Sequence, residues 1–327
     1  MADRFRTSSI HRSQNGVAMI TALLIVAIAT TVAASLSLGQ QVWLRQAQNL
    51  LDHTQASAVR SGVIEWAAII LTKDAKDNQV DDLTEEWATA LPPLPAEGGL
   101  VAGNIHDAQG RFNLNNLVRG GNASTNDIAV FQRLLESQEL PRELADAVVD
   151  WLDSDSQSQP NGAEDVDYLS NERPYRAANQ LLHSVNELRL IKGFDAKAVE
   201  RLRPLVTALP QITAININTA SAIVFGALFS ELSFSEAENL LKDREDRPFK
   251  SADDLKQRLP TDVAPPKVSY DVRSSFFEVR VDSLFGRLQQ RARALLLRTE
   301  NAPVRVIWQQ RELVVTEADQ EPSADEG

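Results

Sequence analysis

The sequence predicts an α+β fold with one long N-terminal helix, an antiparallel sheet, and an all-α domain inserted in the sheet region. Three observations support this fold class. An uncharged apolar run near the N-terminus continues into a segment with helical periodicity. A block of short helical patterns fills the middle of the chain. Segments with the alternation typical of strands lie on both sides of that block.

The composition narrows the possible functions. The chain has 327 residues, a formal net charge of -12 and no cysteine. A disulfide framework and a cysteine-liganded metal are therefore excluded. An acidic balance disfavours nucleic-acid phosphate as a partner, because binding to phosphate depends on clustered Lys and Arg. No G-x-S-x-G sequence, P-loop or triad spacing indicates a catalytic site, so the sequence predicts no enzyme.

The N-terminus predicts a membrane anchor. Residues 1–12 are polar and basic, and no charged residue then appears before Arg45. Within this gap, residues 17–38 form an apolar run of the length that a helix needs to cross a bilayer. A cleaved secretory signal usually has a shorter apolar core. Basic residues before the span predict a cytoplasmic N-terminus, with the bulk of the chain outside the cytoplasm.

Gly16 lies between the polar leader and the apolar run, and Val17 follows it. This arrangement resembles a prepilin-type leader, which a prepilin peptidase cuts on the cytoplasmic side of the membrane after the glycine. The resemblance implies that residues 1–16 are removed, that Val17 becomes the N-methylated first residue, and that the apolar helix is retained.

Thr21 occupies the fifth position after the predicted cleavage, where pilins and most pseudopilins carry glutamate. Glutamate in the membrane needs a positive partner, which in that family is thought to be the terminal amine of the neighbouring subunit. Thr21 cannot form this ion pair. The sequence GVAMITALLIVAIATTVA at 16–33 resembles the minor pseudopilin K of type II secretion, and a subunit without a predecessor implies the tip of a fibre.

Beyond the membrane span, residues 41–75 continue with helical spacing until prolines and glycines at 92–99 break the pattern. We expect strands at 100–107 and 111–117, joined by a turn. The helical patterns that follow lie at 125–135, 144–152, 184–190, 196–202, 220–228, 235–244 and 252–257. Alternation returns at 276–285, 291–298 and 304–309.

This order predicts six regions. They are a leader (1–16), a transmembrane helix (17–38), a body with a helix and the first strands (39–119), an inserted α-helical domain (120–270), the last strands of the body (271–314) and a disordered acidic tail (315–327). A pilin-like fold with a helical domain spliced into its sheet is the architecture of the K pseudopilins, so the resemblance extends along nearly the whole chain.

The densest group of oxygen ligands lies between Asp150 and Glu172. So many carboxylates on a short loop repel one another unless a hard cation neutralises them. The spacing resembles an EF-hand, but Ser158 stands where that motif needs glycine. The stretch also resembles the acidic loop of the K pseudopilins, which binds two structural calcium ions. That resemblance implies as ligands Asp150, Asp153, Asp155, Glu164, Asp165 and Asp167. The alternative is a solvated acidic loop.

Residues 215–259 resemble a helix-hairpin-helix DNA-binding repeat, through Asn-x-Asn-Thr-Ala at 216–220 and Pro-Phe-Lys-Ser at 248–251. The hairpin at 229–235, however, contains no glycine to present backbone amides to phosphate. Glu231 lies within it and Glu236 beside it, so phosphate is repelled. We interpret this segment as a helical fold used for protein contact, without nucleic acid as a partner.

Together these features predict a minor pseudopilin of type II secretion, anchored in the inner membrane with its bulk in the periplasm. The resemblance implies other minor pseudopilins (the I, J and H types), the inner-membrane assembly platform and exported proteins as partners. It also implies a role at the tip of the pseudopilus and in starting its assembly. The alternative is a type IV pilus or DNA-uptake component that uses the helix-hairpin-helix segment.

Overall fold

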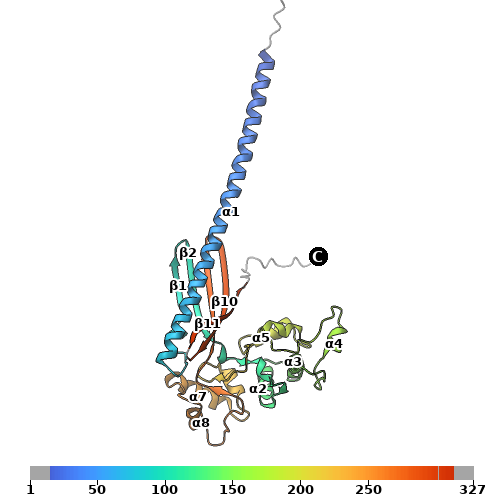
Figure 1. Ribbon diagram of the computed structural model, residues 1–327, viewed down its shortest axis with the longest axis vertical. Coiled ribbons are helices and arrows are strands. Elements are labelled where there is room, and N and C mark those ends of the chain that lie inside the picture. Colours follow the sequence, from blue (N-terminus) through green and yellow to red (C-terminus); the bar gives the residue numbers. More distant parts are fainter. Residues whose placement is uncertain (1–14, 301, 313–327) are drawn as a thin grey trace, which may run out of the picture. The chain divides into compact units, whose positions relative to one another are not determined.

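The computed structural model describes residues 15–300 and 302–312. The chain divides into two compact units, Met1–Ser57 and Ala58–Gly327, which are described separately. Figure 1 labels their helices and strands. The predicted tail and residues 1–14 of the predicted leader lie outside the described residues.

The first unit consists of the N-terminal part of helix α1, Asn15–Asp77, whose later turns belong to the second unit. From Val17 the helix is long and apolar enough to cross a membrane, by length and composition. The apolar side chains of this part, such as Ile20, Leu24 and Ile28, are exposed. An uncovered apolar helix of this length agrees with the predicted membrane span.

The second unit is built on a five-stranded antiparallel sheet, which confirms the predicted α+β fold class. Its strand order is β1-β2-β9-β10-β11. The strands are β1 Leu91–Ala96, β2 Gly99–Asp107, β9 Phe276–Phe285, β10 Leu288–Thr299 and β11 Ala302–Glu312. Because β2 and β9 are neighbours, the long segment between them leaves and re-enters the sheet on adjacent strands.

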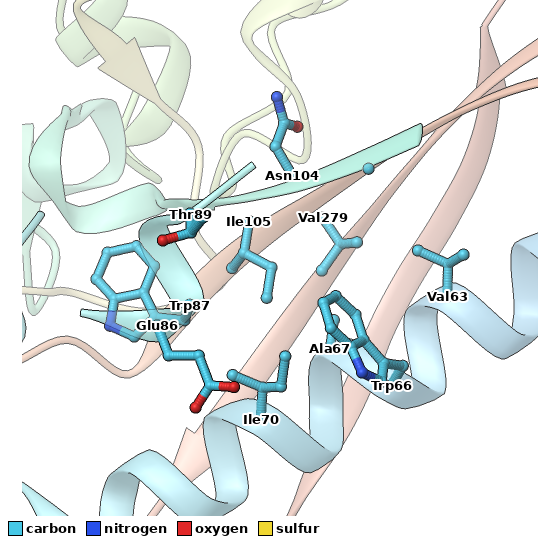
Figure 2. A pocket seen from close by; sticks show the side chains of 11 residues that line it. Val63, Trp66, Ala67, Ile70, Glu86, Trp87, Thr89, Asn104, Ile105 and Val279 are labelled. Atoms are coloured by element: carbon cyan, nitrogen blue, oxygen red, sulfur yellow. The ribbon is translucent and has the colours of Figure 1, made fainter. Parts of the chain in front are cut away.

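Alternation along the strands turns one face of the sheet toward α1. Figure 2 shows Val63, Ala67 and Ile70 of α1 facing Ile105 and Val279 of the sheet. Trp87, in the 3-10 helix Glu86–Ala88, closes this core with its ring edge on Phe277, at a centroid distance of 5.2 Å. The turns of α1 that lie in the second unit therefore pack on the sheet through an apolar stripe.

Two strand predictions differ from the structure. β1 was missed because it contains Pro92, Pro93 and Pro95, but an edge strand tolerates residues that cannot donate to a ladder. The predicted strand at 111–117 is wrong beyond its start, because only β3, Phe112–Asn113, is extended. The Asn113 side chain then accepts a hydrogen bond from the Asn115 amide at 3.2 Å and starts a 3-10 turn, Leu114–Leu117.

The inserted segment runs from 108 to 275, which is longer at both ends than the predicted 120–270. Its helices are α2 Thr125–Ser137, α3 Leu144–Leu152, α4 Asp165–Leu169, α5 Ala196–Leu202, α6 Ala222–Ala227, α7 Phe234–Asp246 and α8 Ala252–Arg258. The short α4 was missed, and the predicted helix at 184–190 is the 3-10 helix Val185–Leu190. Two short strands of the insert, β4 Val118–Arg119 and β5 Asn122–Ala123, pair with each other.

The insert contains two modules of one design. The first opens with β3 and closes with β6, Val206–Thr207, and these two strands pair in parallel. The second opens with β7, Ile215–Asn216, which pairs in parallel with β8, Tyr270–Asp271. Each opening strand contains an asparagine whose side-chain oxygen accepts a hydrogen bond from the backbone amide two residues later. The distance is 3.2 Å between Asn113 Oδ1 and Asn115 N, and 2.9 Å between Asn216 Oδ1 and Asn218 N.

A buried polar network joins the sheet to the second module. The Asp107 carboxylate, at the end of β2, accepts hydrogen bonds from Asn216 Nδ2 at 2.8 Å, Thr219 Oγ1 at 2.6 Å and Ser274 Oγ at 2.6 Å. Gln109 N supplies a fourth bond at 2.7 Å. Burial raises the pKa of Asp107, and the bonds from Ser274, Thr219 and Gln109 offset part of that rise, so donors from both ends of the insert support the buried carboxyl.

A second set of contacts ties the same region to the end of α1. Arg298 of β10 binds Asp74 with Nη1 at 2.6 Å, and its Nη2 bonds to Asp81 and, at 2.7 Å, to Ser274 O. Its guanidinium also lies over the Phe277 ring, 4.6 Å from the centroid. A buried arginine that satisfies two carboxylates and a carbonyl fixes α1, the sheet and the re-entry point relative to one another within this unit.

Glu85 lies next to this network without a cationic partner of its own among the described residues. Oxygens of Asp74, Asp81 and Glu85 lie within 4.8 Å of one another. Glu85 Oε2 accepts bonds from Trp87 Nε1 at 2.6 Å and from Asp82 N at 3.2 Å. Burial, and to a smaller extent the Asp74 carboxylate, raises the pKa of Glu85 to about 7.

The raised pKa predicts a pH-dependent contribution to stability. The folded state favours protonated Glu85, so this contribution is complete below about pH 4.5 and is lost as the pH rises to about 7. Glu85→Gln imitates the neutral acid and should remove this part of the dependence of the unfolding free energy on pH. Urea unfolding of the full chain in detergent, between these pH values, measures it. Glu86→Gln, an exposed neighbour paired with Lys73 at 3.3 Å, is the matched control and should keep the wild-type slope.

Candidate metal centre in the inserted domain

The acidic loop is held between two short helices on an aromatic support. α3 ends at Leu152 and α4 begins at Asp165, so residues 153–164 form the loop. Trp151 packs against Tyr168 with ring centroids 5.2 Å apart, and Tyr175 lies 5.3 Å from Tyr168. The buried rings of Trp151 and Tyr168, with the half-buried ring of Tyr175, fix both ends of the loop, so its carboxylates are positioned by packing.

Three of the six predicted ligands come together. Oxygens of Asp153, Asp155 and Glu164 lie within 4.8 Å of one another. Asp153 directly follows α3 and Glu164 directly precedes α4, so the two helix ends bring them together. Asp155 is exposed, and its Oδ1 accepts the Gln157 amide at 2.8 Å.

Two oxygens of this cluster have no hydrogen-bond partner among the described residues. They are Asp153 Oδ1 and Glu164 Oε1, on residues that are each 5% exposed. Burial, together with the Asp150 and Asp153 carboxylates, raises the pKa of Glu164 to about 7. Burial and Asp155 also raise the pKa of Asp153. Buried polar atoms are normally paired, so these two oxygens indicate a place for a cation.

Asp150 is fully buried next to the cluster, where it shapes the loop. Both of its oxygens accept the Gln159 amide, at 3.1 Å. Burial raises its pKa to about 6, and the Asp153 carboxylate adds to the rise. A Cβ on Gly162 would overlap the Asp150 carboxylate, so the loop can close over this side chain only where residue 162 has none.

Asp165 and Asp167 have other partners in the protein. Asp165 accepts the Ala177 amide at 3.0 Å and pairs with Arg176 at 3.3 Å. Asp167 caps the start of α4 by accepting the Glu164 amide at 3.1 Å, and its other oxygen lies 3.7 Å from Lys192 Nζ. The structure therefore separates the six predicted ligands into a cluster of three, one loop-forming residue and two paired acids.

The donor set of the cluster fits a hard cation. Three carboxylates supply oxygen ligands, and no Lys or Arg among the described residues forms a salt bridge with them. Calcium takes several oxygen ligands in flexible geometry, whereas magnesium demands a regular octahedron and retains waters. Zinc prefers nitrogen or sulfur ligands. His183, the histidine nearest in sequence, is exposed and is not part of the cluster.

The predicted processing and assembly residues lie at the start of α1. Gly16 and Val17 are in its first turns. Thr21 Oγ1 can donate to Val17 O at 3.1 Å and to Ala18 O at 2.9 Å. The hydroxyl is therefore satisfied by its own helix, as is usual for threonine in an apolar helix.

The motif that resembles a DNA-binding repeat has a structural role in the insert. Asn216 donates a hydrogen bond to the Asp107 carboxylate at the end of β2. Asn218 Nδ2 donates to Phe249 O at 2.9 Å, and Asn218 Oδ1 accepts a hydrogen bond from the Phe249 amide at 2.8 Å. Glu236 caps α7 together with Ser233. Sequence reasoning missed that the first asparagine of the motif reaches the sheet, because Asp107 lies more than a hundred residues earlier.

The fold defines a class of protein. It is a pilin-type chain with an apolar N-terminal helix and a helical domain inserted between two neighbouring strands of its sheet. Two family models described as type II secretion system (T2SS), protein K match residues 110–211 and 215–273, which nearly coincide with the two modules. The chain is 37% identical to type II secretion system protein K of Pseudomonas aeruginosa, over 91% of this chain and 93% of that protein.

The protein K of Klebsiella pneumoniae is 34% identical, over 88% of this chain and 93% of the relative. Among solved structures, the GspK-GspI-GspJ complex of enterotoxigenic Escherichia coli contains a chain that matches with a TM-score of 0.74 and 27% identity, over 82% of this chain and all of that one. The chain belongs to the type II secretion system protein K family, and it is a minor pseudopilin of type II secretion.

The close approach of Gly162 to Asp150 predicts a local effect. Gly162→Ala should displace the Asp150 carboxylate and lower the free energy of unfolding by about 1–3 kcal/mol, as overpacking does. Chemical denaturation measures the change. Gly226→Ala is the control, because a Cβ there meets nothing within 4 Å, and alanine in α6 should leave stability equal or higher. Equal stability of both variants would contradict the assigned contact.

Proposed function

We propose that this minor pseudopilin forms the tip of the periplasmic pseudopilus and starts its assembly. The observation that carries the proposal is Thr21, whose hydroxyl bonds to carbonyls of its own helix and offers no charge to a preceding subunit. A buried charge in a membrane is stable only when paired. A subunit that lacks it has no electrostatic need of a neighbour ahead of it.

The inserted domain supports the same position. Its network around Asp107 and Arg298 ties it to the sheet at both of its ends, so it should not swing aside. A domain of this size held firmly on the body would occupy the space that a subunit ahead of it would need. The chain would then act as a structural cap, without a catalytic role.

The partners follow from relatives and from the anchor. A relative of similar fold was solved together with GspI and GspJ, so we propose the I- and J-type minor pseudopilins as direct partners. H-type pseudopilin, the inner-membrane platform and exported proteins are further proposed contacts. The apolar helix would place the N-terminus in the cytoplasm and the second unit in the periplasm, after a prepilin peptidase cuts between Gly16 and Val17 and Val17 is methylated.

The loop cluster gives the cap a structural metal requirement. Asp153, Asp155 and Glu164 would hold a calcium ion, which supplies the positive charge that their clustered oxygens lack. A second ion, as the resemblance implies, would need Asp165 or Asp167 to leave Arg176 or Lys192. We therefore assign the first ion to the three clustered acids and expect weak affinity, with a dissociation constant on the order of 0.1–1 mM.

Calcium should stabilise the full chain, by about 2.7 kcal/mol at a hundred times the dissociation constant. Thermal unfolding with calcium or with a chelator measures this. The double variant Asp153→Asn, Glu164→Gln should lose the response, yet be at least as stable as the wild type in chelator, since mutual repulsion of the acids is relieved. Glu172→Gln, exposed outside the cluster, is the control. If calcium leaves the thermal unfolding of the wild type unchanged, the metal assignment is wrong.

Processing at Gly16 is tested separately. N-terminal sequencing of the native protein should begin at Val17, and Gly16→Val should retain the leader and stop fibre initiation and secretion. Gly39→Ala, at an open position farther along α1, should be processed normally. Normal secretion by a chain that keeps its leader would refute the assembly mechanism while leaving the calcium site untouched.

A further inference from the structure

A pocket of about 170 Å³ lies in the insert between α2, the residues after α6 and the loop before β8. Its walls include Leu228, Phe229, Pro265 and Pro266. Arg133 and Lys267 also line it, and no carboxylate does. In a chain of formal net charge -12, a pocket that combines apolar walls with two cations and has no acid indicates a negatively charged ligand that carries apolar groups.

Arg133 is held in place while part of its binding capacity stays unused. Its Nε donates to Ala227 O at 2.7 Å, and its Nη atoms have no hydrogen-bond partner among the described residues. Burial lowers its pKa, which Glu136 opposes, but Glu136 pairs with Arg142 at 3.5 Å. A partly desolvated guanidinium is stabilised when a carboxylate pairs with it.

The chain itself supplies a ligand of matching charge. Residues 313–327 contain no Lys or Arg and five acids, namely Glu317, Asp319, Glu321, Asp325 and Glu326, with Pro322 and Ala324 among them. The segment follows Glu312, the last residue of β11. β11 runs antiparallel to β10, and Glu312 lies opposite Arg291 of β10.

We propose that the acidic C-terminal segment 313–327 binds in this pocket of its own chain, with carboxylates on Arg133 and Lys267. Fifteen residues at about 3.3 Å each reach roughly 50 Å, which exceeds the roughly 40 Å length of the twelve-residue β10 beside β11. The tether gives an effective concentration in the millimolar range, so a weak ion-paired contact is sufficient. Nucleic-acid phosphate fits less well, because Glu231 and Glu236 lie along the adjoining hairpin.

A carbodiimide, which joins an amine to a carboxylate in contact, tests this on the full mature chain in detergent, with mass spectrometry as the readout. Lys267 should link to acids of 313–327 about fivefold more than Lys197, another exposed lysine of the insert. Arg133→Gln should lower the Lys267 links about fivefold, the factor that corresponds to about 1 kcal/mol. Arg133→Lys should keep them and add links from its new amine.

Arg133→Lys decides the matter if Arg133→Gln does not fold. Mixed isotope-labelled and unlabelled chains separate links within one chain from links between chains. Equal linking of Lys267 and Lys197, hybrid links between chains, or protection of Lys267 by added DNA or phosphate without any link to the tail would each overturn the proposal.

Discussion

The buried carboxylate of Asp107 is the interaction on which the arrangement of the second unit depends. It ends β2, and it receives hydrogen bonds from Asn216 and Thr219 of the second module and from Ser274, just before β9. A buried acid without donors is strongly unfavourable, whereas one that is fully satisfied specifies a single geometry. The sheet accommodates a long insertion because β2 and β9 are neighbours and this network closes the gap where the chain leaves and returns.

The insert shows a structural role for the residues that resemble a DNA-binding repeat. Both modules open with an extended asparagine that turns the chain and begins a parallel pair of strands. In the second module the same asparagine, Asn216, also reaches Asp107. The residues that resemble a phosphate-binding repeat thus stabilise the fold and its attachment. A motif shared at this level shows a reused helical scaffold, and its function lies in the groups around it.

Local patterns predicted much of this fold, and their failures have physical causes. Alternation of Phe277, Val279 and Val281 placed β9 correctly, since those side chains face α1. β1 was missed because proline argues against strands except at edges, and an edge is a tertiary property. At 111–117, asparagine side chains competed for backbone amides and replaced a ladder with a 3-10 turn.

The candidate site shows the same limit, because a run of acids does not say which acids are free. Asp165 and Asp167 seemed equivalent to Asp153 and Glu164 in the sequence. Their partners Arg176 and Lys192 lie eleven and twenty-five residues farther on, and only the fold brings them close. The unpaired oxygens of Asp153 and Glu164 likewise depend on burial in the folded chain, which local spacing cannot reveal.

The second unit contains two clusters of three carboxylates, and their difference identifies the metal candidate. Asp74 and Asp81 both bind the Arg298 guanidinium, which lies inside the first cluster, while burial raises the pKa of its third member, Glu85, to about 7. The protein thus neutralises that cluster with its own groups. Asp153, Asp155 and Glu164 form no salt bridge among the described residues, and two of their buried oxygens remain unpaired. Two clusters with the same number of acids therefore differ in their charge balance: Arg298 neutralises the first, and only the second has the unpaired oxygens on which the proposed calcium site rests.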